Sequence, residues 1–184
     1  MSRRAIVVGL AAVLMQAAAA SAQSSNVEFT VSGSSTVRNW TCSAQGVIAV
    51  TPGTSAIPAP GFASGVQAAT VTVPLKAFKC PNDEMTQHLN EAMKSAEFPE
   101  VVYRLEKYDI AGTQAQATGT MTITGVSKPV SVPVTLTASD KGVQVEGNTK
   151  LEFATFNIEP PAVFLGMLKV GPQIRVSFKG TIAR

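Results

Sequence analysis

Residues 119–136 read GTMTITGVSKPVSVPVTL and carry the clearest fold signal in the chain. Met121 and Ile123 alternate with threonines, and a second alternating run follows a turn at residues 125–127. Apolar side chains at every second position give a strand one buried face and one solvated face. Two such runs joined by a short turn therefore predict two neighbouring strands of an antiparallel sheet.

The same alternation recurs before and after this stretch. Clear runs lie at residues 27–32, 71–75 and 174–179, and shorter apolar segments around residues 47–50, 101–110 and 143–153 bring the expected number to about eight strands. A turn is also expected at Ser32-Gly33-Ser34. Pro133 has no backbone N–H to give to a neighbouring strand, so it needs an outward or edge-like position.

One segment has a helical period instead. Asn82 or Asp83 can cap its start, and Pro99 ends it. Its apolar side chains share one helix face, at Met85, Leu89, Ala92, Met93 and Ala96. Strands with one short amphipathic helix predict an all-β domain, which is either a closed barrel capped by the helix or a two-layer sandwich.

The N-terminus has the three parts of a secretory signal. Residues 1–4 are basic, residues 5–15 are apolar, and Ala20-Ser21-Ala22 is a small-residue cleavage site. We therefore expect cleavage after Ala22, a mature domain over residues 23–184, and a periplasmic or secreted protein. No later segment is long and apolar enough to predict a transmembrane helix in the mature chain.

Charge is sparse in this chain. Charged residues make up 15% of it, and the formal net charge is +3. Arg3 and Arg4 belong to the signal, so their removal lowers the net charge from +3 to +1. A nucleic-acid binder needs a dense basic face, so this class of protein is excluded.

The cysteines are Cys42 and Cys80. An even pair in an exported chain indicates a disulfide, with two buried free thiols as the alternative. No CxxC or His-rich spacing accompanies them, so we expect neither a metal site nor a cofactor.

Catalytic groups are hard to find. His88 is the one histidine and is interpreted as a surface or boundary residue. No GxSxG motif is present, and the acidic residues scatter along strands and a charged stretch. An enzyme is therefore not expected.

A dense apolar run lies within residues 156–171, after Pro160-Pro161. It is too short to span a membrane, so the fold must cover it or it must cover something else. In a barrel we expect it across one mouth, where it either completes the core or lines a ligand cavity.

Several segments together resemble the YceI-like family of exported lipocalin-like proteins. They are Ser35-Thr36-Val37-Arg38-Asn39-Trp40, residues 85–94, Phe98-Pro99-Glu100-Val101, residues 119–130 and residues 160–169. The resemblance implies an eight-stranded antiparallel lipocalin-like barrel with a helix near one end. It also implies an elongated apolar pocket for a polyisoprenoid chain, such as an isoprenoid quinone, and no catalytic residues.

The resemblance, with the signal at the N-terminus, implies a periplasmic or secreted protein that binds an isoprenoid lipid or quinone in an apolar barrel cavity. The alternative is a non-enzymatic structural or interaction module whose barrel is filled by Phe29, Met121, Phe153 and Phe178. The residues expected to contact the ligand from the strands are Phe29, Val31, Met121, Ile123, Val132, Val134, Phe153, Val176 and Phe178. Those expected from the rim are Trp40, Phe164, Leu165 and Met167.

Overall fold

The structure, a computed structural model, describes residues 22–53, 57–163 and 168–183. The predicted signal up to Ser21 and the predicted rim residues Phe164, Leu165 and Met167 lie outside these residues.

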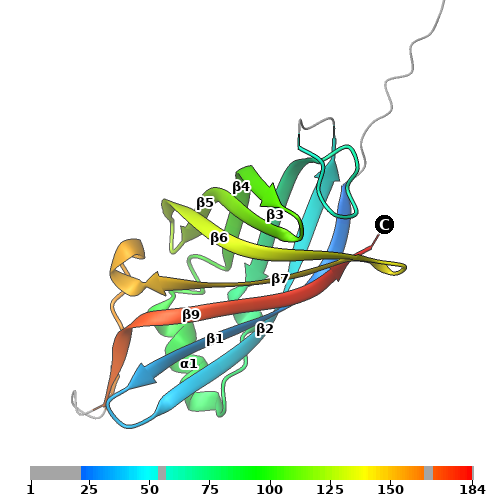
Figure 1. Cartoon of the computed structure of the whole chain (residues 1–184). Helices are drawn as coiled ribbons and strands as arrows, with labels where there is room; N and C mark the ends of the chain where they lie inside the picture. The colour runs from blue at the N-terminus through cyan, green and yellow to red at the C-terminus, as the bar shows by residue number, and fades with distance from the viewer. Residues whose placement is uncertain (1–21, 54–56, 164–167, 184) are drawn as a thin grey trace, which may run out of the picture.

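Eight antiparallel strands follow one another around a closed barrel, and β1 pairs with β9 to close it (Figure 1). The predicted lipocalin-like barrel is therefore confirmed over the sandwich. The eight strands are β1 Gln23–Ser35, β2 Asn39–Pro52, β3 Val66–Pro74, β4 Glu100–Ala111, β5 Gln114–Ile123, β6 Val126–Ser139, β7 Gly142–Glu152 and β9 Leu168–Ile182.

Short elements complete the fold. The helix α1, Asp83–Ala92, lies between β3 and β4 in the chain, after the 3-10 turn η1, Leu75–Ala77. A second 3-10 turn, η2, Phe153–Phe156, precedes the two-residue strand β8, Ala162–Val163, which pairs with the start of β9.

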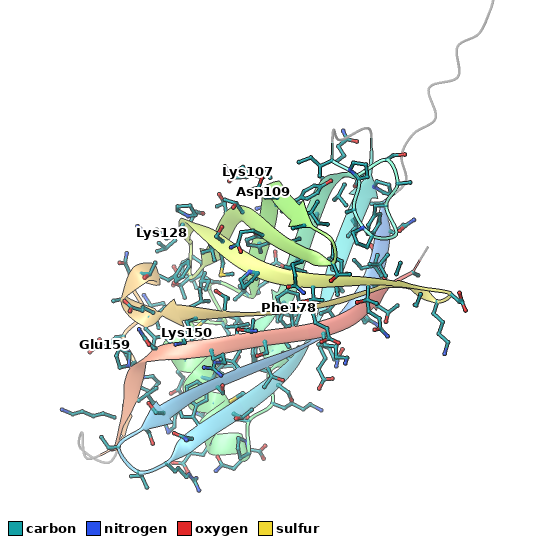
Figure 2. The ribbon with its side chains drawn as sticks, viewed as in Figure 1. Lys107, Asp109, Lys128, Lys150, Glu159 and Phe178 are labelled. Carbon is teal, nitrogen blue, oxygen red and sulfur yellow. A yellow bond between two sulfur atoms is a disulfide. The ribbon has the colours of Figure 1, made fainter. Side chains whose placement is uncertain are left out.

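The predicted alternation decides which side chains face inward. Val27, Phe29 and Val31 of β1 are buried, whereas the residues between them face outward. Lys107, Asp109 and Lys128 project from the outer face (Figure 2). The barrel therefore has an apolar inside and a solvated outside, as expected for an antiparallel sheet with one wet face.

The barrel wall is not paired along its whole height, and two prolines explain why. The β5–β6 ladder runs unbroken through Pro129 and Pro133. The Leu136 N–H donates to the Thr113 carbonyl on the β5 side, and N–H groups along a strand alternate between its two neighbours, so the nitrogens of Pro129 and Pro133 face β7. A proline nitrogen cannot donate a hydrogen bond. The β6–β7 ladder accordingly stops at Val134 and Gly147, beyond which the two strands part (Figure 1).

Two local predictions are wrong. The helix ends at Ala92 and does not reach Ala96, because Lys94 adopts a left-handed backbone conformation with φ 49° and reverses the chain. Ser32-Gly33-Ser34 is not a turn, because β1 continues to Ser35. Gly33 pairs with Trp40, and a Cβ on it would lie 2.5 Å from Trp40 Cζ2, so this glycine makes room for the indole ring.

The Cys42–Cys80 disulfide forms, across a sequence separation of 38. Next to it, Ser43 and Lys79 exchange backbone hydrogen bonds of 2.8 and 2.7 Å. The bond thus ties the segment before α1 to β2 and fixes one rim of the barrel.

Candidate ligand-binding site

The barrel encloses a cavity of about 470 Å³. All eight strands contribute inward-facing side chains to its wall, and most of them are aliphatic or aromatic. The period-two pattern produces this wall directly, because every second residue of a strand faces the interior.

Most of the residues predicted to contact a ligand line this cavity. They are Phe29, Val31, Trp40, Met121, Ile123, Val132, Val134, Phe153, Val176 and Phe178. The structure therefore brings together residues that lie far apart in the sequence. Their contact with a ligand stays a prediction.

The cavity wall also contains residues that the sequence analysis did not nominate. On β4, Val101, Tyr103 and Leu105 face inward, but a bulge between Leu105 and Lys107 shifts the phase so that Tyr108 faces inward too. This shift breaks the simple alternation, so the period-two rule does not identify which residues of β4 face inward. The alternating residues Val71 and Val73 could have been nominated by the rule that was applied to the other strands.

The apolar face of α1 covers one end of the cavity. Met85, Leu89, Ala92 and Met93 line it, as the amphipathic pattern predicts. Asn82 caps this helix, accepting a 2.8 Å hydrogen bond from the Met85 backbone N–H. The cap sets where the helix begins and so which of its residues face the cavity.

The charged residues of the cavity, with several of its polar ones, gather at this same helix end. Ser35 at the end of β1 and Arg38 just before β2, together with Asn82, Glu84 and His88, form the rim. We call these five residues the helix-side rim.

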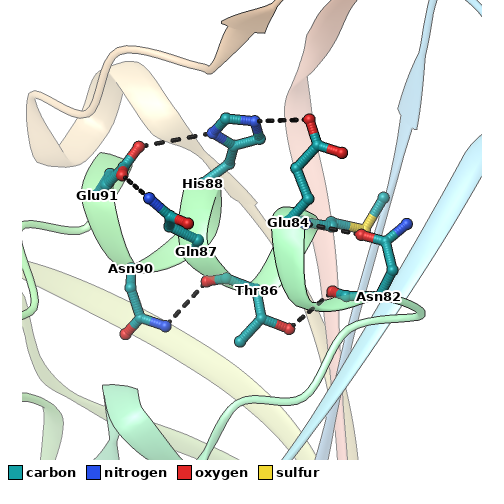
Figure 3. A network of polar contacts seen from close by, with 8 residues as sticks. Asn82, Glu84, Thr86, Gln87, His88, Asn90 and Glu91 are labelled. Atoms are coloured by element: carbon teal, nitrogen blue, oxygen red, sulfur yellow. Dashed lines mark hydrogen bonds and ion pairs between the residues drawn. The ribbon is translucent and has the colours of Figure 1, made fainter.

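His88 lies between two carboxylates on the helix surface (Figure 3). Its Nε2 is 3.7 Å from Glu84 Oε1, and its Nδ1 is 3.5 Å from Glu91 Oε2. A 2.7 Å hydrogen bond from Gln87 Nε2, together with His88, lowers the pKa of Glu91. The predicted boundary position of His88 is confirmed, since the ring is partly exposed and borders the cavity.

The opposite end of the cavity is covered by the segment before β3. Ala59 and Phe62 are buried, line the cavity and exchange backbone hydrogen bonds of 3.0 and 2.8 Å. Tyr108 holds this segment through its hydroxyl, which accepts from the Val66 N–H and donates to the Ile57 carbonyl. No periodicity in the sequence marks Ala59 or Phe62 as cavity residues.

One phenol in the cavity wall has a strongly shifted pKa. Burial raises the pKa of Tyr103 to about 12, and the nearby Glu106 carboxylate adds to the shift. A phenol is protonated at neutral pH even without this shift, so the Tyr103 hydroxyl can act as a hydrogen-bond donor.

The part of the chain that the structure describes holds no group of three His, Cys, Asp or Glu residues able to bind a metal ion. Within the same residues, no helix has the length and apolarity needed to cross a bilayer.

Known proteins share this architecture. A model of the YceI-like domain matches residues 19–182. No match was found among curated protein sequences.

Several solved structures share the fold. BcnA of Burkholderia cenocepacia superposes with a TM-score of 0.63 at 16% identity, covering 84% of this chain and 94% of that one. A YceI protein of Campylobacter jejuni has a TM-score of 0.59 at 16% identity, with 97% and 94% covered. A polyisoprenoid-binding domain of Saccharophagus degradans, implicated in plant cell wall breakdown, has a TM-score of 0.65 at 13% identity, with 89% and 100% covered.

Proposed function

This chain belongs to the family of YceI-like domains, and from that premise we propose that it binds an isoprenoid lipid or quinone inside its barrel. The observation that carries this proposal is the cavity of about 470 Å³ behind an apolar wall. Its size falls within the roughly 300–1,000 Å³ of small-molecule sites. The description of the Saccharophagus degradans domain as polyisoprenoid-binding supports the same ligand class.

An apolar cavity can bind such a chain without a charged anchor. Each buried CH₂ group contributes about 0.8 kcal/mol, so a few isoprene units give a large gross gain. Loss of translational freedom and chain ordering offset part of this gain. Binding by shape and apolarity also explains why the sequence has no catalytic motif, and the proposed role is non-enzymatic.

The alternative is an interaction module with a filled barrel. Phe29, Met121, Phe153 and Phe178 were the side chains expected to fill that core, yet all four border open space in the cavity. This placement favours the carrier over the module.

We also propose that the protein acts outside the cytosol, as a periplasmic or secreted domain over residues 23–184 after removal of residues 1–22. The Cys42–Cys80 bond supports export, because disulfides persist in oxidising compartments and are rare in the cytosol.

Lipid analysis tests the binding function. The full chain is produced with its own signal, purified from the exported fraction and extracted with organic solvent, and the extract is analysed by mass spectrometry. We expect an isoprenoid lipid in near-stoichiometric amount. Stripped protein should also take up menaquinone-4 from solution. If the extract is empty and the stripped protein takes up no menaquinone-4, the carrier function is wrong and the interaction module replaces it.

A further inference from the structure

Tyr103 carries an enclosed polar atom that has no partner. Within the described residues, three fully enclosed side-chain atoms lack a hydrogen bond: Gln23 Oε1, Asn90 Oδ1 and the Tyr103 hydroxyl. Of these three residues, Tyr103 alone lines the cavity. An unpaired buried hydroxyl destabilises a protein, so its presence in a cavity wall calls for an explanation.

The surroundings of Tyr103 supply no partner. Tyr103 lies on β4, paired with Val71 on one side and Met121 on the other. Its ring extends over Gly119 of β5, where a Cβ would lie 2.9 Å from Tyr103 Cζ, the carbon that bears the hydroxyl. The cluster against which it packs is hydrophobic and includes Met121 and Ile123.

Most other polar groups of the wall are hydrogen-bonded or belong to the helix-side rim, and Thr149 of β7 is a further, partly exposed hydroxyl of the wall. The Tyr108 hydroxyl bonds to the Val66 N–H and the Ile57 carbonyl, and Trp40 Nε1 donates to the Ser34 carbonyl at 3.2 Å. The charged side chains that border the cavity belong to the helix-side rim. Tyr103 is thus a hydrogen-bond donor that packs against an apolar cluster.

We propose that the Tyr103 hydroxyl is the polar anchor of the cavity and donates a hydrogen bond to an uncharged oxygen of the bound lipid, such as a quinone carbonyl. This inference rests on the proposed function. Met93 and Met121 pack in the same cluster, and flexible methionine side chains can move to admit a ligand atom beside the enclosed hydroxyl. The anchor selects a neutral acceptor, because a phosphate buried there would lack a cation.

The test compares two isoprenoid probes in the full mature chain. Menaquinone-4 carries carbonyl acceptors, whereas squalene is a hydrocarbon without one. Tyr103→Phe removes only the hydroxyl. We expect it to weaken menaquinone-4 binding by about three- to tenfold, the range for loss of one hydrogen bond, and to leave squalene binding unchanged.

Two further readouts separate an anchor from a packing residue. In the parent protein the carbonyl stretch of bound menaquinone-4 should shift to lower frequency, and Tyr103→Phe should abolish that shift. The empty variant should also melt at the same or a higher temperature than the parent, because an unpaired hydroxyl is gone. Thr118→Val is the control: it removes a hydroxyl that is hydrogen-bonded to Ser131 on the outer face of the barrel, so it should change neither the ratio of the two affinities nor the carbonyl shift.

The outcomes are distinct. If the parent binds both probes and Tyr103→Phe changes neither the affinity ratio nor the carbonyl shift, the anchor is refuted while the binding function stands. The anchor is equally refuted if a polyprenyl phosphate binds more tightly than menaquinone-4 and Arg38→Ala removes the difference, because the head then lies at the rim. If the parent binds neither probe, the proposed function itself fails.

Discussion

The ring of Phe178 lies directly over the backbone of Gly147, where a Cβ would be 2.4 Å from Phe178 Cζ and 2.8 Å from the Pro133 carbonyl oxygen. The ring also faces Phe29, with centroids 5.8 Å apart. Phe178 borders the inner cavity and a polar hollow on the outer face, close to where β6 and β7 part (Figure 2). Because Gly147 has no side chain, the Phe178 ring can fill the barrel wall at the point where the β6–β7 ladder ends.

Gly147→Ala should therefore disturb both fold and cavity. The added methyl must push the Phe178 ring inward, which we expect to lower the free energy of unfolding by about 1–3 kcal/mol and to reduce lipid uptake. Denaturant unfolding and lipid extraction measure the two effects. Asn148→Ala, at the next and outward-facing residue, is the control. A Gly147→Ala protein with parental stability and loading would contradict this account of the wall.

Val132→Phe should fill cavity volume from β6. Val132 is 6% exposed and lines the cavity, so the larger ring is expected to weaken lipid uptake. Overpacking should lower the free energy of unfolding by about 1–3 kcal/mol. Ser131→Ala is the matched outward control. It loses one exposed hydrogen bond, to Thr118, and should change stability by less than about 0.5 kcal/mol. Parental lipid loading in a folded Val132→Phe variant would show that this position does not limit the site.

The disulfide should contribute measurably to stability. Closing a loop of 38 residues is worth about 4 kcal/mol in the chain-entropy model. We expect the paired variant Cys42→Ala/Cys80→Ala to melt roughly 10 °C lower than the parent. Non-reducing peptide mapping of the exported protein should recover the two cysteine peptides joined. Thiols that alkylate without reduction would contradict the bond.

Stability should fall at alkaline pH through Tyr103. Its pKa is about 12 in the folded protein, against about 10 for an unperturbed tyrosine. The unfolded chain therefore loses this proton first, and the contribution is intact below about pH 10 and lost as the pH rises toward 12. Denaturant unfolding from pH 9 to 12 should show a steeper decline for the parent than for Tyr103→Phe. Equal slopes would mean that the phenol is not perturbed.

The exported chain should begin at Gln23. This prediction rests on the small-residue site Ala20-Ser21-Ala22, which follows the apolar segment. Intact mass of the protein recovered from the exported fraction measures the cleavage point directly. Retention of residues 1–22 would indicate an N-terminal anchor in place of a removed signal.

Prediction succeeded where the signal is local. Alternation identified the strands, and Asn82 with its following apolar face identified α1, because both depend on residues within a few positions of one another. The end of the helix was misplaced because the reversal at Lys94 requires a left-handed backbone that lysine rarely adopts. The turn expected at Gly33 was wrong because that glycine accommodates Trp40 across the β1–β2 pair.

The sequence by itself determined the all-β class, the inward phase of most strands and the pairing of the two cysteines, since periodicity and residue count set these. Tertiary structure decided the rest. Whether inward side chains fill a barrel or leave about 470 Å³ open depends on how eight strands close, which no single segment encodes. The enclosed Tyr103 hydroxyl and the Phe178 ring over Gly147 likewise arise only when the strands pack into the barrel, because burial and close contact are properties of the packed chain.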